Sequence, residues 1–278
     1  MIRFSSLCLA ALALLAGWSL PAAYAVTFPD KNLETALRTM VYEKRTNMDE
    51  LTDEDLRKIS TLEARGRKIQ NLSGIEKCTN ILLIDLSENE IGDLGPLRGL
   101  VGLQSLSLAN NKIADLTPLM DLNKLQYLNL SGNQIKALQP LSAMTKLSAL
   151  YLAENQIEEL APLAGLAGLS SLDLAKNKIA NIKPIANLSR CSVLKLSDNA
   201  IEDLAPATQH PPQSMLIIER NKIADLGALV SAAKADAEGR KTFAPFLRLY
   251  LAGNPLSDAA KNEQLTALKN SGVRIENQ

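Results

Sequence analysis

The stretch Leu103-Gln104-Ser105-Leu106-Ser107-Leu108-Ala109-Asn110-Asn111-Lys112-Ile113 decides the fold, because the same frame returns throughout the chain. Three further copies run from Leu125 to Ile135, from Leu147 to Ile157 and from Leu169 to Ile179. Asparagine recurs in steps of 22 residues, at Asn89, Asn111, Asn133, Asn155, Asn177, Asn199 and Asn221. Proline follows with the same period, at Pro96, Pro118, Pro140, Pro162, Pro184 and Pro206. A fixed period of this length predicts a solenoid of stacked coils.

The alternation of leucines within each copy predicts a short strand. Leu106 and Leu108 share one side of such a strand, while the residues between them face the other side. One strand cannot bury its apolar side alone, but stacked coils place successive strands about 4.8 Å apart in a parallel sheet. The leucine columns then form one continuous core. The predicted fold is an α/β solenoid with a curved parallel sheet on its concave face.

The asparagine column has a structural role in this prediction. The chain must turn sharply after each strand, which leaves backbone N–H and C=O groups pointing inward. An unpaired buried polar group costs about 1–3 kcal/mol, so a buried carboxamide is expected to satisfy them. We expect each side chain to bond its own coil and the next coil. The predicted ladder consists of Asn89, Asn111, Asn133, Asn155, Asn177, Asn199, Asn221 and Asn254.

The convex return of each coil begins at the proline, which fixes φ. Only about ten residues are available for this return, so we expect 3₁₀ turns or very short helices there. The frame also extends beyond the seven regular copies, since Leu247 to Asn254 form another strand copy. Asn254 lies 33 residues after Asn221, which implies an insertion of 11 residues, mostly within 231–242, where a surface helix is expected. We assign residues 61–256 to about nine coils.

Helical caps are expected at both ends, because terminal coils would otherwise expose their core. Residues 26–60 are assigned to an N-terminal cap, in which Thr52 and Asp55 are spaced as a capping box. Residues 257–278 are assigned to a C-terminal cap, with a helix from Ser257 to about Asn270 and Gly272 as its stop. Arg67 stands where the first coil would have its asparagine.

The repeat Asn-x-Ile-x-Asp-Leu-x-Pro-Leu, with its helical cap and asparagine-less first coil, resembles the bacterial internalin-like group of leucine-rich-repeat proteins, also called the SDS22-like class. The resemblance covers about residues 28–278. It implies a non-catalytic scaffold that binds a protein, since known members are adhesins and invasins that bind host receptors. The chain shows no obvious cell-wall sorting signal and no adjoining immunoglobulin-like domain, which are features of surface-anchored members.

The N-terminus has the pattern of a secretory signal peptide. Arg3 supplies a positive charge, an apolar stretch runs from Leu7 to Leu20, and Ala23-Tyr24-Ala25 provides a small-x-small cleavage pattern. We therefore predict cleavage of residues 1–25 and export to the periplasm or the medium. An uncleaved membrane anchor is the alternative, because the apolar stretch approaches spanning length. No membrane span is expected in the mature chain.

Composition narrows the class of partner. Lys+Arg and Asp+Glu both total 30, so the formal net charge is zero. A neutral chain without a basic block argues against nucleic acid as a partner. Aromatic residues make up only 4% of the chain against 46% hydrophobic residues, so the core must be aliphatic. The expected state is a monomer with a protein ligand.

The sequence offers no recognisable catalytic, cofactor or metal site. Its one histidine, His210, lies in a proline-rich loop, and no His/Cys/Asp cluster has metal-ligand spacing. Cys78 and Cys191 fall in core leucine columns, about five coils apart, which is roughly 24 Å at the spacing of sheet strands. A disulfide needs Cα atoms within about 7 Å. We predict two buried free thiols.

The functional surface is expected on the concave face, at strand positions that no core constraint fixes. One group there contains Tyr127, Asn129 and Tyr151, and another contains Val193, Met215, Ile217, Arg248 and Tyr250. Aromatic residues, Met and Arg are enriched in interfaces, and apolar surface patches often mark contacts. The second group could instead be covered by the 231–242 insertion or the C-terminal segment. The candidate partner-binding residues are Tyr127, Asn129, Tyr151, Asp173, Lys195, Met215, Ile217, Arg248 and Tyr250.

Three functional hypotheses follow. The first is a secreted or periplasmic module that binds a protein through its concave face. The second is a structural or assembly protein of the cell envelope. The third is an accessory or inhibitory subunit of an enzyme, against which predicted export argues.

Overall fold

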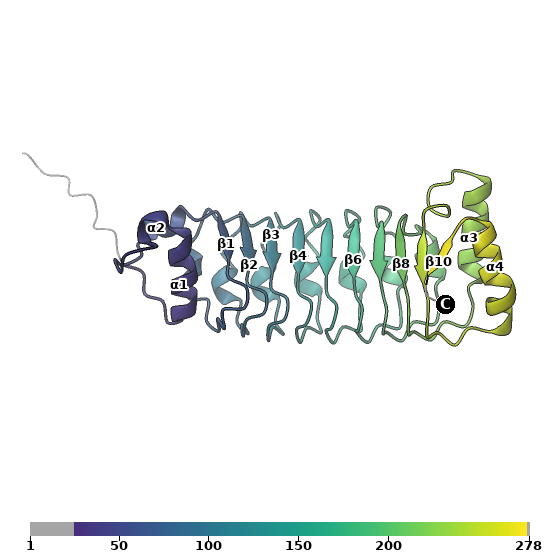
Figure 1. Ribbon diagram of the computed structural model, residues 1–278, viewed down its shortest axis with the longest axis horizontal. Helices are drawn as coiled ribbons and strands as arrows, with labels where there is room; N and C mark the ends of the chain where they lie inside the picture. Colours follow the sequence, from purple (N-terminus) through teal and green to yellow (C-terminus); the bar gives the residue numbers. More distant parts are fainter. Residues whose placement is uncertain (1–24, 277–278) are drawn as a thin grey trace, which may run out of the picture.

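The sheet runs the length of the molecule. The computed structural model describes residues 25–276, and within them ten strands form one parallel sheet in sequence order, from β1 to β10. Figure 1 shows these strands side by side along the long axis. The strands are β1 (Thr61–Glu63), β2 (Leu83–Asp85), β3 (Ser105–Ser107), β4 (Tyr127–Asn129), β5 (Ala149–Tyr151), β6 (Ser171–Asp173), β7 (Val193–Lys195), β8 (Met215–Ile217), β9 (Arg248–Tyr250) and β10 (Arg274–Glu276). This arrangement confirms the predicted α/β solenoid.

The register of the sheet follows the 22-residue period. Leu106 of β3, for example, pairs with Ile84 of β2 on one side and Leu128 of β4 on the other. In every strand from β2 to β8 the middle residue is buried and its two neighbours are partly exposed. The leucine columns therefore form one continuous aliphatic core, as the alternation predicts.

The convex side consists of short turns. They are η2 (Ile75–Lys77), η3 (Gly95–Leu97), η4 (Thr117–Leu119), η5 (Gln139–Leu141), η6 (Ala161–Leu163), η7 (Lys183–Ile185) and η8 (Ala205–Thr208). From η3 to η8 they are each preceded by a leucine or isoleucine. All seven are 3₁₀ turns, and η3 to η8 each carry the repeat proline at the start. Proline is tolerated there because the first residues of a helix have no intrahelical partner for their N–H groups. The prediction of 3₁₀ turns is confirmed.

The asparagine side chains bridge neighbouring coils. Asn133 Nδ2 donates to the carbonyl oxygens of Leu108 (3.0 Å), Leu130 (3.0 Å) and Ser131 (3.3 Å), and its Oδ1 accepts from the N–H of Ile113 (3.0 Å). Leu108 and Ile113 belong to the preceding coil. The expectation that each asparagine bonds the next coil is therefore wrong in direction, because the carboxamide points back towards the turn stacked before it.

This direction explains why the first coil has no asparagine. The turn of that coil is already satisfied by Asn89, whose Oδ1 accepts from Arg67 and Ile69 N–H and whose Nδ2 donates to Ala64 O. An asparagine at Arg67 would have no preceding coil to bond. At the other end, Asn254 spans the insertion and reaches back to Ile218 O at 2.9 Å.

The residue before each ladder asparagine adopts a left-handed backbone. Its φ is +58° at Glu88, +57° at Glu154 and +53° at Lys176, whereas glycine occupies the same position at 132 and 253. A left-handed conformation costs a non-glycine residue roughly 1–2 kcal/mol. The buried hydrogen bonds of the following asparagine offset this strain, which recurs in every ladder coil that lacks glycine at this position.

The N-terminal cap consists of α1 (Lys31–Met40), η1 (Tyr42–Lys44) and α2 (Asp53–Arg57). Thr52 and Asp55 form the predicted capping box at the start of α2. Asp30 connects the cap to the solenoid. Its Oδ1 caps α1 at Asn32 N, and its Oδ2 accepts from Gln70 N of the first coil at 2.7 Å. The predicted signal peptide, residues 1–25, lies outside the described residues except for Ala25.

The insertion after β8 forms helix α3 (Gly227–Glu238). It starts in phase with the 3₁₀ turns, 22 residues after Ala205, so it begins earlier than the 231–242 segment expected from the sequence. α3 packs against η8 and the C-terminal helix α4 (Leu265–Asn270). It therefore extends the convex side of its coil and does not lie over the concave face.

Asp236 closes the loop that follows α3. Its Oδ1 accepts from Thr242 N and Oγ1 at 2.8 and 2.7 Å, and its Oδ2 accepts from Phe243 and Ala244 N–H at 3.0 and 2.9 Å. Partial burial of the carboxylate raises its pKa, but these hydrogen bonds outweigh burial and lower the pKa to about 2.

The C-terminal cap begins where Ser257 Oγ accepts from Ala260 N at 3.1 Å. A π-helical segment, η9 (Ala260–Gln264), leads into α4, and Gly272 with φ of +96° ends it. The π-helical segment was not predicted. Over the described residues, none of the helices combines the length and apolar character needed to cross a membrane.

Cys78 and Cys191 are buried in the core as free cysteines, in agreement with their leucine columns. Burial raises the pKa of Cys78 to about 12 and that of Cys191 to about 11. Both thiols therefore remain protonated and pack as small hydrophobic side chains.

Replacing Asn133 with alanine should lower the free energy of unfolding by about 2–4 kcal/mol, because buried backbone groups of two coils lose their partner. Urea denaturation of the two chains measures the difference. The matched control is Asn123→Ala, at an exposed position, where the change should stay within about 0.5 kcal/mol. Equal midpoints for Asn133→Ala and the wild type would contradict the structural role of the ladder.

Replacing Asp236 with asparagine should destabilise the chain near neutral pH, because an amide cannot accept all four hydrogen bonds. The folded-state pKa of Asp236 is depressed to about 2, so its stabilising effect is present above about pH 4 and is lost as pH falls towards 2. Denaturation midpoints of both chains between pH 2 and pH 6 (roughly the range of carboxyl titration) test this. A stability difference that grows on acidification would contradict it.

Candidate functional site

The candidate partner-binding residues all lie on the concave face, at the outer two positions of their strands. Tyr127 and Asn129 lie on β4, Tyr151 on β5, Asp173 on β6, Lys195 on β7, Met215 and Ile217 on β8, and Arg248 and Tyr250 on β9. All are partly buried except Arg248, which is exposed. The parallel register places them in two adjacent columns. Their contacts divide them into three sets.

The first set is an aromatic pair on neighbouring strands. The rings of Tyr127 and Tyr151 have centroids 5.5 Å apart and planes inclined by 47°. Asn129 shares its strand with Tyr127 and is in register with Tyr151. Burial raises the pKa of Tyr127, so its hydroxyl stays protonated and can donate a hydrogen bond. The pair offers a ligand both ring surface and polar atoms.

The second set is an ion pair. Lys195 Nζ lies 3.2 Å from Asp173 Oδ2, and the two residues are in register on β7 and β6. Opposite charges on neighbouring strands stabilise a sheet by a few tenths of a kcal/mol up to about 1 kcal/mol. These two side chains neutralise each other within the sheet, so they carry little free charge for a ligand.

The third set is the apolar group of Val193, Met215, Ile217 and Tyr250, with Arg248 at its edge. Neither α3 nor α4 packs on it, since α3 contacts η8 and α4, and α4 contacts α3, η9 and β10. β10 extends the sheet beside it, with Arg274 in register with Arg248. The group therefore remains a partly exposed strip at the C-terminal end of the face.

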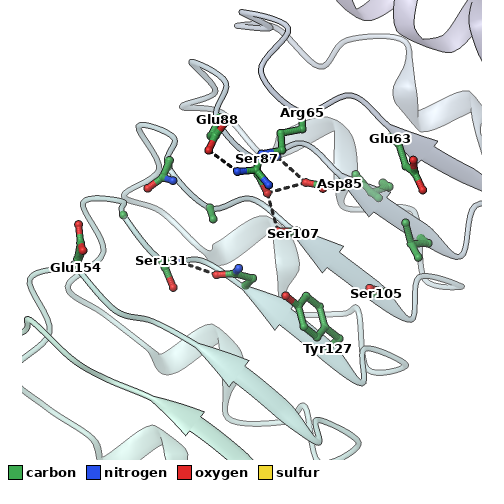
Figure 2. Close-up of a pocket in the computed structure, with 16 residues that line it drawn as sticks. Glu63, Arg65, Asp85, Ser87, Glu88, Ser105, Ser107, Tyr127, Ser131 and Glu154 are labelled. Atoms are coloured by element: carbon green, nitrogen blue, oxygen red, sulfur yellow. Dashed lines mark hydrogen bonds and ion pairs between the residues drawn. The ribbon is translucent and has the colours of Figure 1, made fainter. Parts of the chain in front are cut away.

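A hollow on the same face was missed by the sequence reasoning (Figure 2). It has a volume of about 610 Å³ and lies over the first strands of the sheet. Its floor is formed by Ser105, Ser107 and Ala109, whose small side chains lie between Asp85 on one side and Tyr127 on the other. Small residues at both outer positions of one strand, Ser105 and Ser107 of β3, were the signal that could have revealed it.

Carboxylates and hydroxyls line this hollow. Ser87 Oγ donates to Asp85 Oδ1 at 2.6 Å and lies 2.7 Å from Ser107 Oγ, as Figure 2 shows. Arg65 forms an ion pair with Glu88 at 2.6 Å, which lowers the pKa of that carboxyl. Glu63 and Glu154 complete the acidic lining. The arrangement is suited to hold a polar or positively charged group.

The described residues contain no grouping of three or more His, Cys, Asp or Glu side chains able to hold a metal ion. His210 is exposed in the loop after η8 and lies outside the lining of the hollow.

Comparisons with known proteins agree with this geometry. The family model "Leucine Rich repeats (2 copies)" matches residues 79–120, 101–143 and 123–165. Among solved structures, internalin C2 of Listeria monocytogenes is 30% identical with a TM-score of 0.71, over 83% of this chain and 94% of that one.

A second internalin of Listeria monocytogenes, InlF, is 25% identical with a TM-score of 0.44, over 90% of this chain and 91% of that one. None of the curated proteins matches this chain. The repeat, the parallel sheet, the helical cap and the likeness to internalin C2 lead to one conclusion: the chain belongs to the internalin-like leucine-rich-repeat family.

Proposed function

We propose that this chain is an exported, non-catalytic protein that binds a protein ligand on the concave face of its sheet. The observation that carries the proposal is the aromatic pair of Tyr127 and Tyr151, partly exposed on the concave face. Tyrosine is enriched in the energetic centres of interfaces, because it combines apolar area with a hydroxyl and loses little conformational entropy.

The surroundings of the pair support the same function. The hollow adjoins Tyr127 on the side of β3, and the apolar strip follows on β7 to β9. A centre of aromatic and apolar residues with a polar margin is the usual anatomy of a protein interface. The short strands supply a rigid base for these side chains, so a ligand would meet a preorganised surface.

The double substitution Tyr127→Ala/Tyr151→Ala should weaken ligand binding about 30-fold or more while leaving the fold intact, because neither residue belongs to the leucine core. The ligand is captured on the immobilised chain from envelope extract or medium and identified. Its affinity for both chains is then measured by surface plasmon resonance.

The matched control for this experiment is Tyr42→Ala, since Tyr42 is an exposed tyrosine of the N-terminal cap (78% exposed). It should leave the affinity unchanged. A captured protein that binds the double variant as tightly as the wild type would overturn the proposed site. A chain that scatters light as an oligomer would favour the assembly hypothesis instead.

Export predicts that the mature chain begins at Val26. The test is the intact mass of the protein purified from its native source, together with its distribution between membrane and soluble fractions. A chain that retains residues 1–25 and sediments with membranes would replace the cleaved signal peptide with an uncleaved anchor. That outcome would not affect the proposed binding of a protein on the concave face.

A further inference from the structure

The hollow carries an excess of negative charge that its own cations do not neutralise. Four carboxylates line it, from Glu63, Asp85, Glu88 and Glu154, whereas Arg65 is the single cation among the lining residues described. Arg65 pairs with Glu88, and Glu154 pairs with Lys176 at 2.8 Å. Within residues 25–276, Glu63 and Asp85 have no ion pair closer than 4.0 Å. Two negative charges are therefore left over.

These two carboxylates come from neighbouring strands of the sheet. Glu63 on β1 and Asp85 on β2 are in register on the same face of the sheet, about 4.8 Å apart at the usual strand spacing. Like charges in this relation destabilise a sheet. The same column shows the opposite arrangement on β6 and β7, where Asp173 is in register with Lys195 and bonds it. Neighbouring strands thus carry opposite charges at Asp173 and Lys195, but like charges at Glu63 and Asp85 beside the hollow.

The charge of Asp85 is not required by the fold. Asp85 Oδ1 accepts from Ser87 N at 2.9 Å, which holds the bend after the strand. Asn129, two coils later in the same column, does the same through its amide oxygen, which accepts from Ser131 N at 3.1 Å. An uncharged amide therefore suffices for this turn. The second carboxylate oxygen of Asp85 makes no hydrogen bond within the described residues and remains available.

The wall opposite Asp85 is aromatic. Tyr127 lies two strands away across the floor of Ser105 and Ser107 (Figure 2), a separation of about 10 Å. A guanidinium group can stack on a tyrosine ring and donate paired hydrogen bonds to a carboxylate at the same time. A volume of about 610 Å³ accommodates an arginine side chain together with part of the segment that bears it.

We infer that the hollow is a subsite for a positively charged side chain of the protein ligand, best matched by arginine, which lies between Tyr127 and Asp85, stacks on the ring and donates to the carboxylate. Glu63, on the next strand beyond Asp85, adds negative charge to the same side of the hollow. This inference rests on the proposed protein-binding function and adds the chemistry of the ligand. It places the electrostatic part of recognition on β1 to β4, next to the aromatic pair.

The test uses a display library of random dodecapeptides, selected on the immobilised full chain. Arginine should be enriched severalfold over the starting library in the selected peptides. An arginine peptide from this selection should then bind Glu63→Gln/Asp85→Asn about tenfold or more weaker, because charge-assisted hydrogen bonds are lost. Thermal unfolding of both chains checks that the variant is folded. We expect it to be, because Asn129 already holds the equivalent turn with an uncharged amide.

The matched control is Glu158→Gln/Glu159→Gln, which removes the same charge at exposed positions outside the hollow. It should bind the arginine peptide like the wild type. If the control and the hollow variant lose the same affinity for the peptide, the loss comes from the change in net charge alone, and the inference is overturned. Selected peptides that lack basic residues but depend on Tyr127 and Tyr151 would also overturn it, while leaving the proposed function standing. A library that yields no binders counts against both.

Discussion

The structure depends on one interaction, the buried carboxamide that bonds two coils at once. Each ladder asparagine satisfies carbonyl groups of its own turn and both a carbonyl and an N–H group of the turn before it. A 22-residue coil has no hydrophobic core of its own and no internal sheet, so its sharp turn would otherwise bury unpaired polar groups at a cost of about 1–3 kcal/mol each. The ladder makes stacking favourable, and stacking in turn creates the core.

This constraint also separates scaffold from surface. Inward positions are fixed by the leucine columns, and the residue before each asparagine must accept a left-handed backbone even where it is Glu or Lys. The outer strand positions carry no such requirement. Differences among them are therefore free to serve the proposed binding of a ligand. The contrast between Glu63 beside Asp85 and Asp173 beside Lys195 supports the proposed subsite for that reason.

The likeness to internalin C2 covers nearly all of that protein, which shows the family of this chain. The features that we connect with binding, namely the tyrosine pair and the acidic hollow, arise from particular residues of this sequence. The repeat unit could carry many other residues at the same positions without a change of fold. A shared scaffold therefore leaves room for different ligands within one family.

The sequence by itself determined the solenoid, because each of its determinants is periodic. The 22-residue recurrence of Asn, Leu and Pro, the capping box of Thr52 and Asp55 and the placement of Cys78 and Cys191 in core columns could all be read without coordinates. The columns of the concave face could be listed as well, including Tyr127 and Tyr151.

Only the tertiary structure decided how neighbouring coils interact. It showed that the asparagines bond backwards, that α3 extends the convex side, and that Ser105 and Ser107 leave a hollow between Asp85 and Tyr127. The physical reason is that these properties depend on side-chain volume and direction across strands 22 residues apart. A periodic pattern states which residues share a column, but contacts between coils exist only once the coils are stacked.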